Sequence, residues 1–247
     1  MNHSAGFFIF LMFYFLNTNF DTNDPQLNEE EGKHALKALR LNLGDKILVG
    51  NGNGVQYTCQ IAGIDQKKTT LVIENTEKFD KPNTRLCIAI APTKNPSRME
   101  WFVEKATEMG VDEIIPIQTS RTERPRLKTD RLERIVLAAA KQSRRAFIPN
   151  LRELTPLEAL GEEASDLRII AHCEDGTPKK SLEELLKNAS GKVLIAIGPE
   201  GDFTKSEINH ALEKGFSAGH LGAQRLRTET AGVFSAAAFA LLLGSKM

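Results

Sequence analysis

Two short segments near the C-terminus concentrate glycine and polar residues, and each lies between an apolar run and a helical pattern. The first is IGPEGDF at residues 197–203, after the apolar run 193–197, and the second is LGAQRLRTETA at residues 221–231. Glycine permits positive φ and lets a ligand approach the backbone closely. Loops at the carboxyl ends of neighbouring parallel strands enclose a crevice for a ligand. The sequence therefore predicts a ligand site between these two segments.

The second segment ends in Thr228, Glu229 and Thr230, just before a helix that we predict at residues 231–243. A hydroxyl and a carboxylate suit the start of a helix, because the amides exposed there are donors and carry partial positive charge. The helix is apolar on all sides, so it must be buried.

Taken in order, GPEG after a strand and LRTETA before a small-residue helix resemble the SPOUT class of S-adenosyl-L-methionine (AdoMet)-dependent RNA methyltransferases. Within that class the chain is most similar to the RsmE type, which methylates N3 of a uridine in small-subunit ribosomal RNA. Further matches are KATEMGV at residues 105–111, AKQS at 140–143 and HALKALR at 34–40. The likeness covers nearly the whole chain after residue 12. One departure is Asp202, where many members have a second glycine after GPEG.

The resemblance implies that AdoMet is the cofactor and that three loops bind it, at residues 171–174, 198–201 and 221–231. The residues expected at the cofactor are Ala171, His172, Gly198, Pro199, Glu200, Gly201, Leu221, Gly222, Leu226, Arg227, Thr228, Thr230 and Ala231. GPEG alone is also typical of an ordinary turn. Its combination with LRTETA at the family spacing favours the cofactor site. His172 follows a predicted strand, and an ordinary strand-end histidine is the alternative there.

Methylation of uridine N3 requires the loss of a weakly acidic proton, and this calls for a base or for a group that favours the anionic ring. We expect Arg227 to stabilise negative charge on the uracil. Glu229 or a main-chain carbonyl is expected to accept the proton. The alternative is that Arg227 and Glu229 form a structural ion pair that fixes the loop.

The charge of the whole chain gives no indication of a nucleic-acid partner, because the formal net charge is zero. Residues 121–145 differ, with nine basic side chains against three acidic ones. A local basic excess is typical of a phosphate-binding surface, although it also fits a solvated helix face. The residues expected to contact RNA are Lys94, Arg98, Arg121, Arg124, Gln142 and Arg145.

The chain divides into two predicted domains around a polar, proline-containing linker near residues 78–83. Residues 12–80 give strands at 46–49, 55–61 and 69–74 and a single short helix at 34–41, a pattern similar to small RNA-binding barrels. Residues 81–247 alternate strands and helices, among them a long helix at 129–145, which predicts a parallel sheet covered on both faces. Pattern alone indicates a doubly wound α/β domain. The resemblance implies an α/β SPOUT domain with a trefoil knot, preceded by a small PUA-like β-barrel domain.

The apolar run at residues 6–16 is too short to span a bilayer and lacks the features of a secretory signal. We interpret Met12 as the native start and residues 1–11 as an upstream extension without function; a membrane anchor is the alternative. Three scattered cysteines and five scattered histidines predict no disulfide and no metal site, and they suit a cytoplasmic protein.

The leading hypothesis is therefore an AdoMet-dependent methyltransferase that makes 3-methyluridine, with 16S rRNA of the small ribosomal subunit as its partner and no membrane contact. The resemblance also implies that the enzyme is a homodimer to which the final helix contributes. Two rivals remain: a non-catalytic RNA-binding protein that retains the fold, and a small-molecule enzyme that binds a nucleotide in the crevice. The intact GPEG and LRTETA segments disfavour the first, and the additional barrel domain with the basic stretch disfavours the second.

Overall fold

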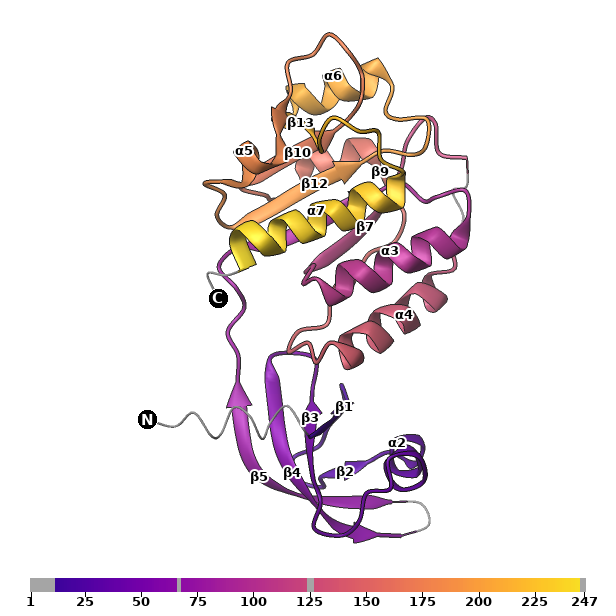
Figure 1. Ribbon diagram of the computed structural model, residues 1–247, viewed down its shortest axis with the longest axis vertical. Helices are drawn as coiled ribbons and strands as arrows, with labels where there is room; N and C mark the ends of the chain where they lie inside the picture. The colour runs from indigo at the N-terminus through magenta and orange to yellow at the C-terminus, as the bar shows by residue number, and fades with distance from the viewer. Residues whose placement is uncertain (1–11, 66–67, 124–126, 245–247) are drawn as a thin grey trace. The chain divides into compact units, whose positions relative to one another are not determined.

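The computed structural model describes residues 12–65, 68–123 and 127–244, and the chain forms two compact units (Figure 1). The first unit contains the chain up to Lys81 together with residues 141–148. The second contains residues 82–140 and the chain from Pro149 onward. A short segment from the middle of the sequence is thus part of the N-terminal unit.

The N-terminal unit is built on a five-stranded sheet with the order β1-β3-β4-β5-β2. The strands are β1 Phe13–Leu16, β2 Gln26–Leu27, β3 Lys46–Gly50, β4 Val55–Ile64 and β5 Thr69–Lys78. Strand β1 runs parallel to β3, and the other neighbours are antiparallel. Alternate residues such as Phe15, Ile47 and Cys59 are fully buried in one hydrophobic core. Irregularities in the β4–β5 register, after Thr58 and Ile61, add local twist to this pair.

The helix predicted at residues 34–41 starts earlier than expected. Helix α2 spans Glu29–Lys33, because Asn28 caps it by accepting a hydrogen bond from the Glu31 amide at 2.8 Å. It continues as a π-helical turn, His34–Ala38, and Arg40 then adopts a left-handed conformation with φ 57°. The residues that predict a separate helix therefore form the last turn of a helical segment that begins at Glu29.

Residues 141–148 are held to the N-terminal strands by backbone and side-chain contacts. The Gly54 amide donates to the Ala146 carbonyl at 2.8 Å, and the Ile148 amide donates to the Gly52 carbonyl at 2.9 Å. The Tyr14 hydroxyl donates to the Arg145 carbonyl at 3.1 Å. Helix α4, Thr129–Gln142, accordingly ends three residues before the predicted position.

The second unit is an α/β structure around a parallel sheet with the order β11-β13-β10-β12-β6-β7-β8, and β9 pairs with β7. Its strands are β6 Arg85–Ile90, β7 Glu113–Gln118, β8 Asn150–Leu151, β9 Thr155–Pro156, β10 Leu167–Ala171, β11 Lys180–Ser181, β12 Lys192–Ile197 and β13 Ser217–His220. The predicted α/β class and parallel sheet are confirmed. The trefoil knot stays a prediction.

Helices cover both faces of this sheet. They are α3 Pro96–Glu108, α4, α5 Leu182–Leu186, α6 Lys205–Glu213 and α7 Thr228–Leu243, with the 3-10 helix η2 Leu157–Glu162. Cys87 and Ala89 of β6 share a core with α6 and η2. On the other face α7 packs against α3, α5 and β6 (Figure 1). Gly232 permits this packing, since a Cβ there would lie 2.5 Å from the Phe102 ring.

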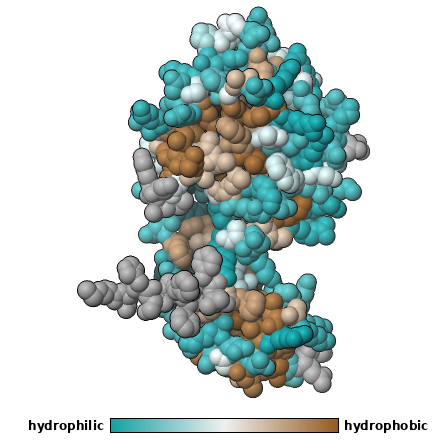
Figure 2. All heavy atoms as spheres, in the orientation of Figure 1, coloured by the Kyte–Doolittle hydropathy of each residue, from teal (hydrophilic) through white to brown (hydrophobic). Residues whose placement is uncertain are grey.

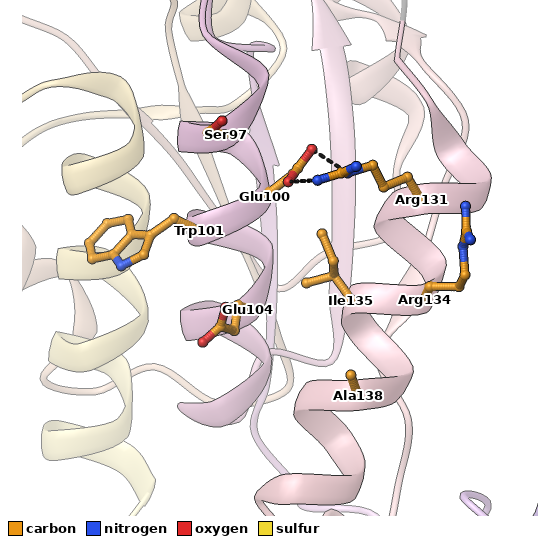
Figure 3. A pocket seen from close by; sticks show the side chains of 8 residues that line it. All are labelled: Ser97, Glu100, Trp101, Glu104, Arg131, Arg134, Ile135 and Ala138. Atoms are coloured by element: carbon orange, nitrogen blue, oxygen red, sulfur yellow. Dashed lines mark hydrogen bonds and ion pairs between the residues drawn. The ribbon is translucent and has the colours of Figure 1, made fainter.

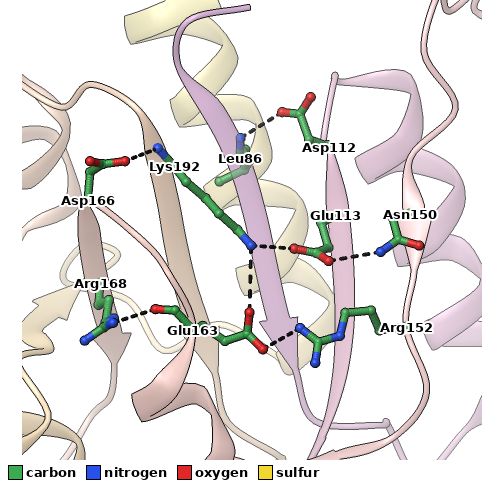
Figure 4. A network of polar contacts seen from close by, with 9 residues as sticks. All are labelled: Leu86, Asp112, Glu113, Asn150, Arg152, Glu163, Asp166, Arg168 and Lys192. Carbon is green, nitrogen blue, oxygen red and sulfur yellow. Dashed lines mark hydrogen bonds and ion pairs between the residues drawn. The ribbon is translucent and has the colours of Figure 1, made fainter. Parts of the chain in front are cut away.

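A network of charged side chains joins the amino ends of the central strands (Figure 4). Lys192 at the start of β12 pairs with Glu113 at the start of β7, with 2.7 Å between Nζ and Oε2. Burial raises the pKa of Glu113, but the hydrogen bond and charge of Lys192 outweigh it and leave that pKa below its ordinary value. These contacts lie at the edge of the sheet opposite to the carboxyl ends of the same strands.

Candidate active site

A cleft of about 960 Å³ lies at the carboxyl ends of β10, β12 and β13. Three loops line it, at residues 171–175, 197–202 and 220–228, together with Arg121, Lys179 and Ala231. This volume lies within the range of roughly 300–1,000 Å³ typical of small-molecule sites. The two glycine-rich segments and the end of β10 thus form one concave surface, as the sequence predicts.

The first of the two segments makes a tight turn after the buried strand β12. A Cβ at Gly198 would lie 3.2 Å from the Phe203 ring and from the Phe203 amide nitrogen, so this position has little room for a side chain. The Asp202 amide donates to the Pro199 carbonyl at 2.9 Å and closes the turn. The segment therefore forms a compact turn along the cleft.

Asp202, the departure from the family pattern, adopts φ 64°, the left-handed conformation that glycine favours. Its carboxylate stabilises this conformation by accepting hydrogen bonds from two amides, those of Phe203 at 2.8 Å and Cys173 at 2.7 Å. The second bond connects the loop after β12 to the loop after β10. The aspartate thus keeps the turn and adds a bridge that glycine lacks.

The second segment is connected to the first through a buried hydrogen bond. The Thr228 hydroxyl donates to the Gly198 carbonyl at 3.0 Å, and Thr228 is almost fully buried. Helix α7 begins at Thr228, three residues earlier than predicted, and its N-cap residue Arg227 makes no side-chain cap. The expected capping by the hydroxyl is therefore wrong, because the hydroxyl is used to hold the neighbouring loop.

His172 places an unsatisfied imidazole at the cleft. Only 4% of this residue is exposed, and neither ring nitrogen has a hydrogen-bond partner in the described part of the chain. Burial, together with the charge of Lys179, lowers the pKa of His172 below its ordinary value of 6.5. At neutral pH the ring is uncharged and offers one donor and one acceptor to a ligand.

The structure separates the two predicted catalytic residues. Arg227 lines the cleft, is exposed, and forms no ion pair with any described residue. Glu229 is 6% exposed and is absent from the cleft lining; its Oε1 lies 3.5 Å from Nε of Arg98. The alternative of an Arg227–Glu229 ion pair is therefore not found.

All the residues expected at the cofactor line the cleft, except Thr230, which is exposed on the first turn of α7. The cleft also includes residues that sequence reasoning missed. Arg225 lies in the loop 221–231 that the sequence assigns to the cofactor but was not among the single residues expected there; it is exposed at the cleft and has no ion pair among the described residues. Lys179 gave no signal; it donates to the Glu174 carbonyl at 2.8 Å.

The residues expected to contact RNA are distributed over both units. Lys94 pairs with Glu123 at 2.9 Å, Arg98 faces Glu229, and Arg121 lines the cleft. Arg124 lies outside the described residues. Gln142 and Arg145 belong to the N-terminal unit.

A second pocket, of about 490 Å³, lies between α3 and α4. In it an acidic side chain neutralises part of the positive charge of residues 121–145. There Arg131 forms a two-point ion pair with Glu100, at 2.6 and 2.8 Å (Figure 3). Arg134 of the same helix donates to the Asp130 carbonyl of its own first turn and forms no ion pair with any residue that the structure describes. The local excess of positive charge counted in the sequence is therefore smaller on the folded surface.

Two family models match the chain, "RNA methyltransferase domain" over residues 80–240 and "RNA methyltransferase PUA domain" over residues 27–74. The chain therefore belongs to this family of RNA methyltransferases with an N-terminal PUA domain. Among curated relatives, Ribosomal RNA small subunit methyltransferase E of Aquifex aeolicus is 30% identical, over 83% of this chain and 89% of the relative. The enzyme of the same name from Bacillus subtilis is 27% identical, over 85% and 86%.

Solved structures agree with this assignment. A probable rRNA-methyltransferase from Porphyromonas gingivalis has a TM-score of 0.86 and 35% identity, covering 96% of this chain and all of that one. A Legionella pneumophila protein solved with the bound cofactor SAM (AdoMet) has a TM-score of 0.78 and 25% identity, covering 93% and 97%.

Three further findings concern the described residues only. None of their helices is long and apolar enough to cross a membrane. They include no group of three or more His, Cys, Asp or Glu side chains arranged to hold a metal ion. Cys59 and Cys87 are buried free thiols, and Cys173 is an exposed one.

Proposed function

We propose that this protein transfers the methyl group of AdoMet to N3 of a uridine in 16S rRNA of the small ribosomal subunit. The observation that carries the proposal is the cleft formed by the two glycine-rich segments in a member of an RNA methyltransferase family. Relatives that align over most of the chain are named Ribosomal RNA small subunit methyltransferase E. Action in the cytoplasm follows from this substrate and stays a prediction.

The residues of the cleft suit AdoMet. The unsatisfied His172 nitrogens need a polar partner, and the adenine, ribose and amino-acid groups of AdoMet all offer one. Gly198, Gly201 and Gly222 would bring backbone groups close to it, and Gly222, at φ 123°, has open space beside it. When bound, AdoMet supplies a methyl group on a positively charged sulfur. His172 and the three loops would hold it at the carboxyl edge of the sheet.

Arg227 is our candidate for the group that assists the chemistry. Uridine N3 must lose its proton before or as the N–CH₃ bond forms and the S–CH₃ bond breaks, and negative charge develops on the uracil ring as the proton leaves. A guanidinium that is exposed at the cleft and free of ion pairs with described residues is suited to stabilise that charge. The place of Glu229, outside the cleft lining, favours a main-chain carbonyl as the acceptor of the hydrogen bond from N3–H, with water taking up the proton.

We further propose that the enzyme is a homodimer that pairs through α7 and α3. Along α7, Phe234 is 44% exposed and Leu241 is 77% exposed, while Trp101 of α3 is 42% exposed. Apolar side chains gather over this region of the surface (Figure 2), and the indole of Trp101 points from α3 to the side of α7 (Figure 3). Large exposed apolar patches are unusual on monomers. A second copy would cover this one.

The test is methyl transfer to small subunits from a strain that lacks the gene, with AdoMet labelled in its methyl group. We expect label in 16S rRNA and a new reverse-transcription stop at one uridine, because N3-methylation blocks the pairing edge. Small subunits that bind the protein but gain no label would instead support the non-catalytic RNA-binding protein. Stabilisation of the protein by ATP but not by AdoMet would support the small-molecule enzyme.

A further inference from the structure

The loop after β7, residues 119–122, is a compact turn placed beside the cleft. The Thr119 amide donates to the Thr122 hydroxyl at 2.9 Å, and the Thr122 amide donates back to the Thr119 carbonyl at 3.1 Å. The turn is fixed to α6, since the Ser120 amide donates to Glu207 Oε1 at 2.7 Å. Arg121 therefore extends from a rigid base.

From this base, Arg121 reaches the turn that follows β12. Its Nη1 donates to the Gly201 carbonyl at 2.6 Å and lies 3.4 Å from the Phe203 carbonyl. The side chain passes close over Gly201, because a Cβ added there would lie 3.3 Å from Arg121 Cδ. Arg121 thus bridges two loops that are about 80 residues apart in sequence.

Glu207 of α6 also connects these two loops. Its Oε2 accepts from the Thr204 amide at 2.7 Å and from the Thr204 hydroxyl at 2.8 Å, while its Oε1 holds Ser120. Burial raises the pKa of Glu207, but these hydrogen bonds outweigh it and leave the pKa below its ordinary value. The carboxylate is therefore charged at neutral pH. It holds Ser120, beside Arg121, and Thr204, which follows the turn that Arg121 contacts.

We infer that Arg121 is a positioning residue for the cofactor, acting through the Gly201 carbonyl. This inference rests on the proposed AdoMet-dependent function and departs from the expectation that Arg121 binds RNA. Its hydrogen bond to Gly201 orients the peptide groups of residues 200–202, which line the cleft. A loop held in its binding conformation loses less conformational entropy when a ligand binds. Arg121 accordingly raises affinity for AdoMet before RNA is present.

The experiment compares the full-length wild type with Arg121→Ala and Arg121→Lys, using calorimetry with AdoMet in the absence of RNA. We expect the Kd for AdoMet to rise roughly tenfold for Arg121→Ala, the loss typical of one hydrogen bond from a charged donor. Arg121→Lys retains a donor and should recover part of the affinity. Arg134→Ala is the matched control, because it removes a positive charge from the same stretch without touching residues 198–203, and it should leave this Kd unchanged.

Steady-state assays then separate positioning from RNA contact. Positioning predicts a raised KM for AdoMet, with kcat and the KM for small subunits unchanged at saturating AdoMet. An unchanged Kd for AdoMet combined with weaker RNA binding and a shallower salt dependence would overturn the inference and restore Arg121 to the RNA surface. An Arg121→Ala protein with wild-type values throughout would also overturn it. Failure of the wild type itself to bind AdoMet would instead refute the proposed function.

Discussion

The hydrogen bond between the Thr228 hydroxyl and the Gly198 carbonyl gives the sharpest test of how the cleft is assembled. Thr228→Val keeps the shape of the side chain and removes the donor. The bond is 3.0 Å long and buried, so its loss leaves the Gly198 carbonyl without this partner. A typical hydrogen bond contributes about 1 kcal/mol, and an unsatisfied buried group raises the cost to about 1–3 kcal/mol.

This cost has two measurable consequences. If the bond forms equally with and without cofactor, the melting temperature falls by roughly 2–12 °C, since about 1 kcal/mol corresponds to about 2–4 °C in a domain of 150–250 residues. If its loss lets the two loops separate, AdoMet must restore their arrangement, and the Kd rises tenfold for each ~1.4 kcal/mol. The two effects share the same free energy, so we expect a fall in melting temperature within this range together with a Kd increase of at most about 100-fold.

Calorimetry with AdoMet and thermal unfolding without it measure the two effects on the same samples. Thr228→Ser is the control, because it keeps the hydroxyl and loses only a methyl group; its AdoMet affinity should stay near that of the wild type. The reasoning would be refuted if Thr228→Val bound AdoMet as tightly as the wild type and unfolded at the same temperature. The two loops would then be held together by other contacts.

Three other predictions concern catalysis, assembly and pH. Arg227→Ala should bind AdoMet normally while methyl transfer falls by about two orders of magnitude, measured with small subunits; unchanged turnover would exclude its charge-stabilising role. Phe234→Asp combined with Leu241→Asp should convert the dimer to a monomer in light scattering, and a wild type that is itself monomeric would contradict the proposed interface. Since the folded-state pKa of His172 lies below 6.5, the unfolded chain takes up its proton first. The melting temperature should therefore fall as the pH drops below 6.5, and His172→Asn should reduce that slope; an identical slope in the variant would exclude His172 as its source.

The parallel sheet and its helices were predictable from sequence because each is a local pattern. The run at residues 193–197 is apolar throughout, as expected for a strand that is covered on both faces, and β12 is Lys192–Ile197. Helix ends were less certain. Helix α7 starts at Thr228, whose hydroxyl donates to the distant Gly198 carbonyl, a contact that no local pattern contains.

The sequence also could not predict that residues 141–148 belong to the N-terminal unit. Periodicity extends the basic helix to residue 145, but the chain leaves the helix at Gln142 and pairs with the N-terminal strands at Gly52 and Gly54. Arg144 adopts φ 54° in this segment. Backbone groups of an irregular segment need partners, and here strands far away in sequence supply them.

By itself, the sequence determined the motifs and hence the site. Glycines that follow buried strands and precede helices must lie at the carboxyl edge of a parallel sheet, because the chain direction fixes which end carries these loops. The tertiary structure decided the role that each polar side chain can take. Glu229 faces Arg98, Arg121 reaches Gly201, and Arg227 remains at the cleft. Charge and residue type are visible in a sequence, but folding decides which partner, if any, each polar group meets, because packing brings together residues that are far apart in the chain.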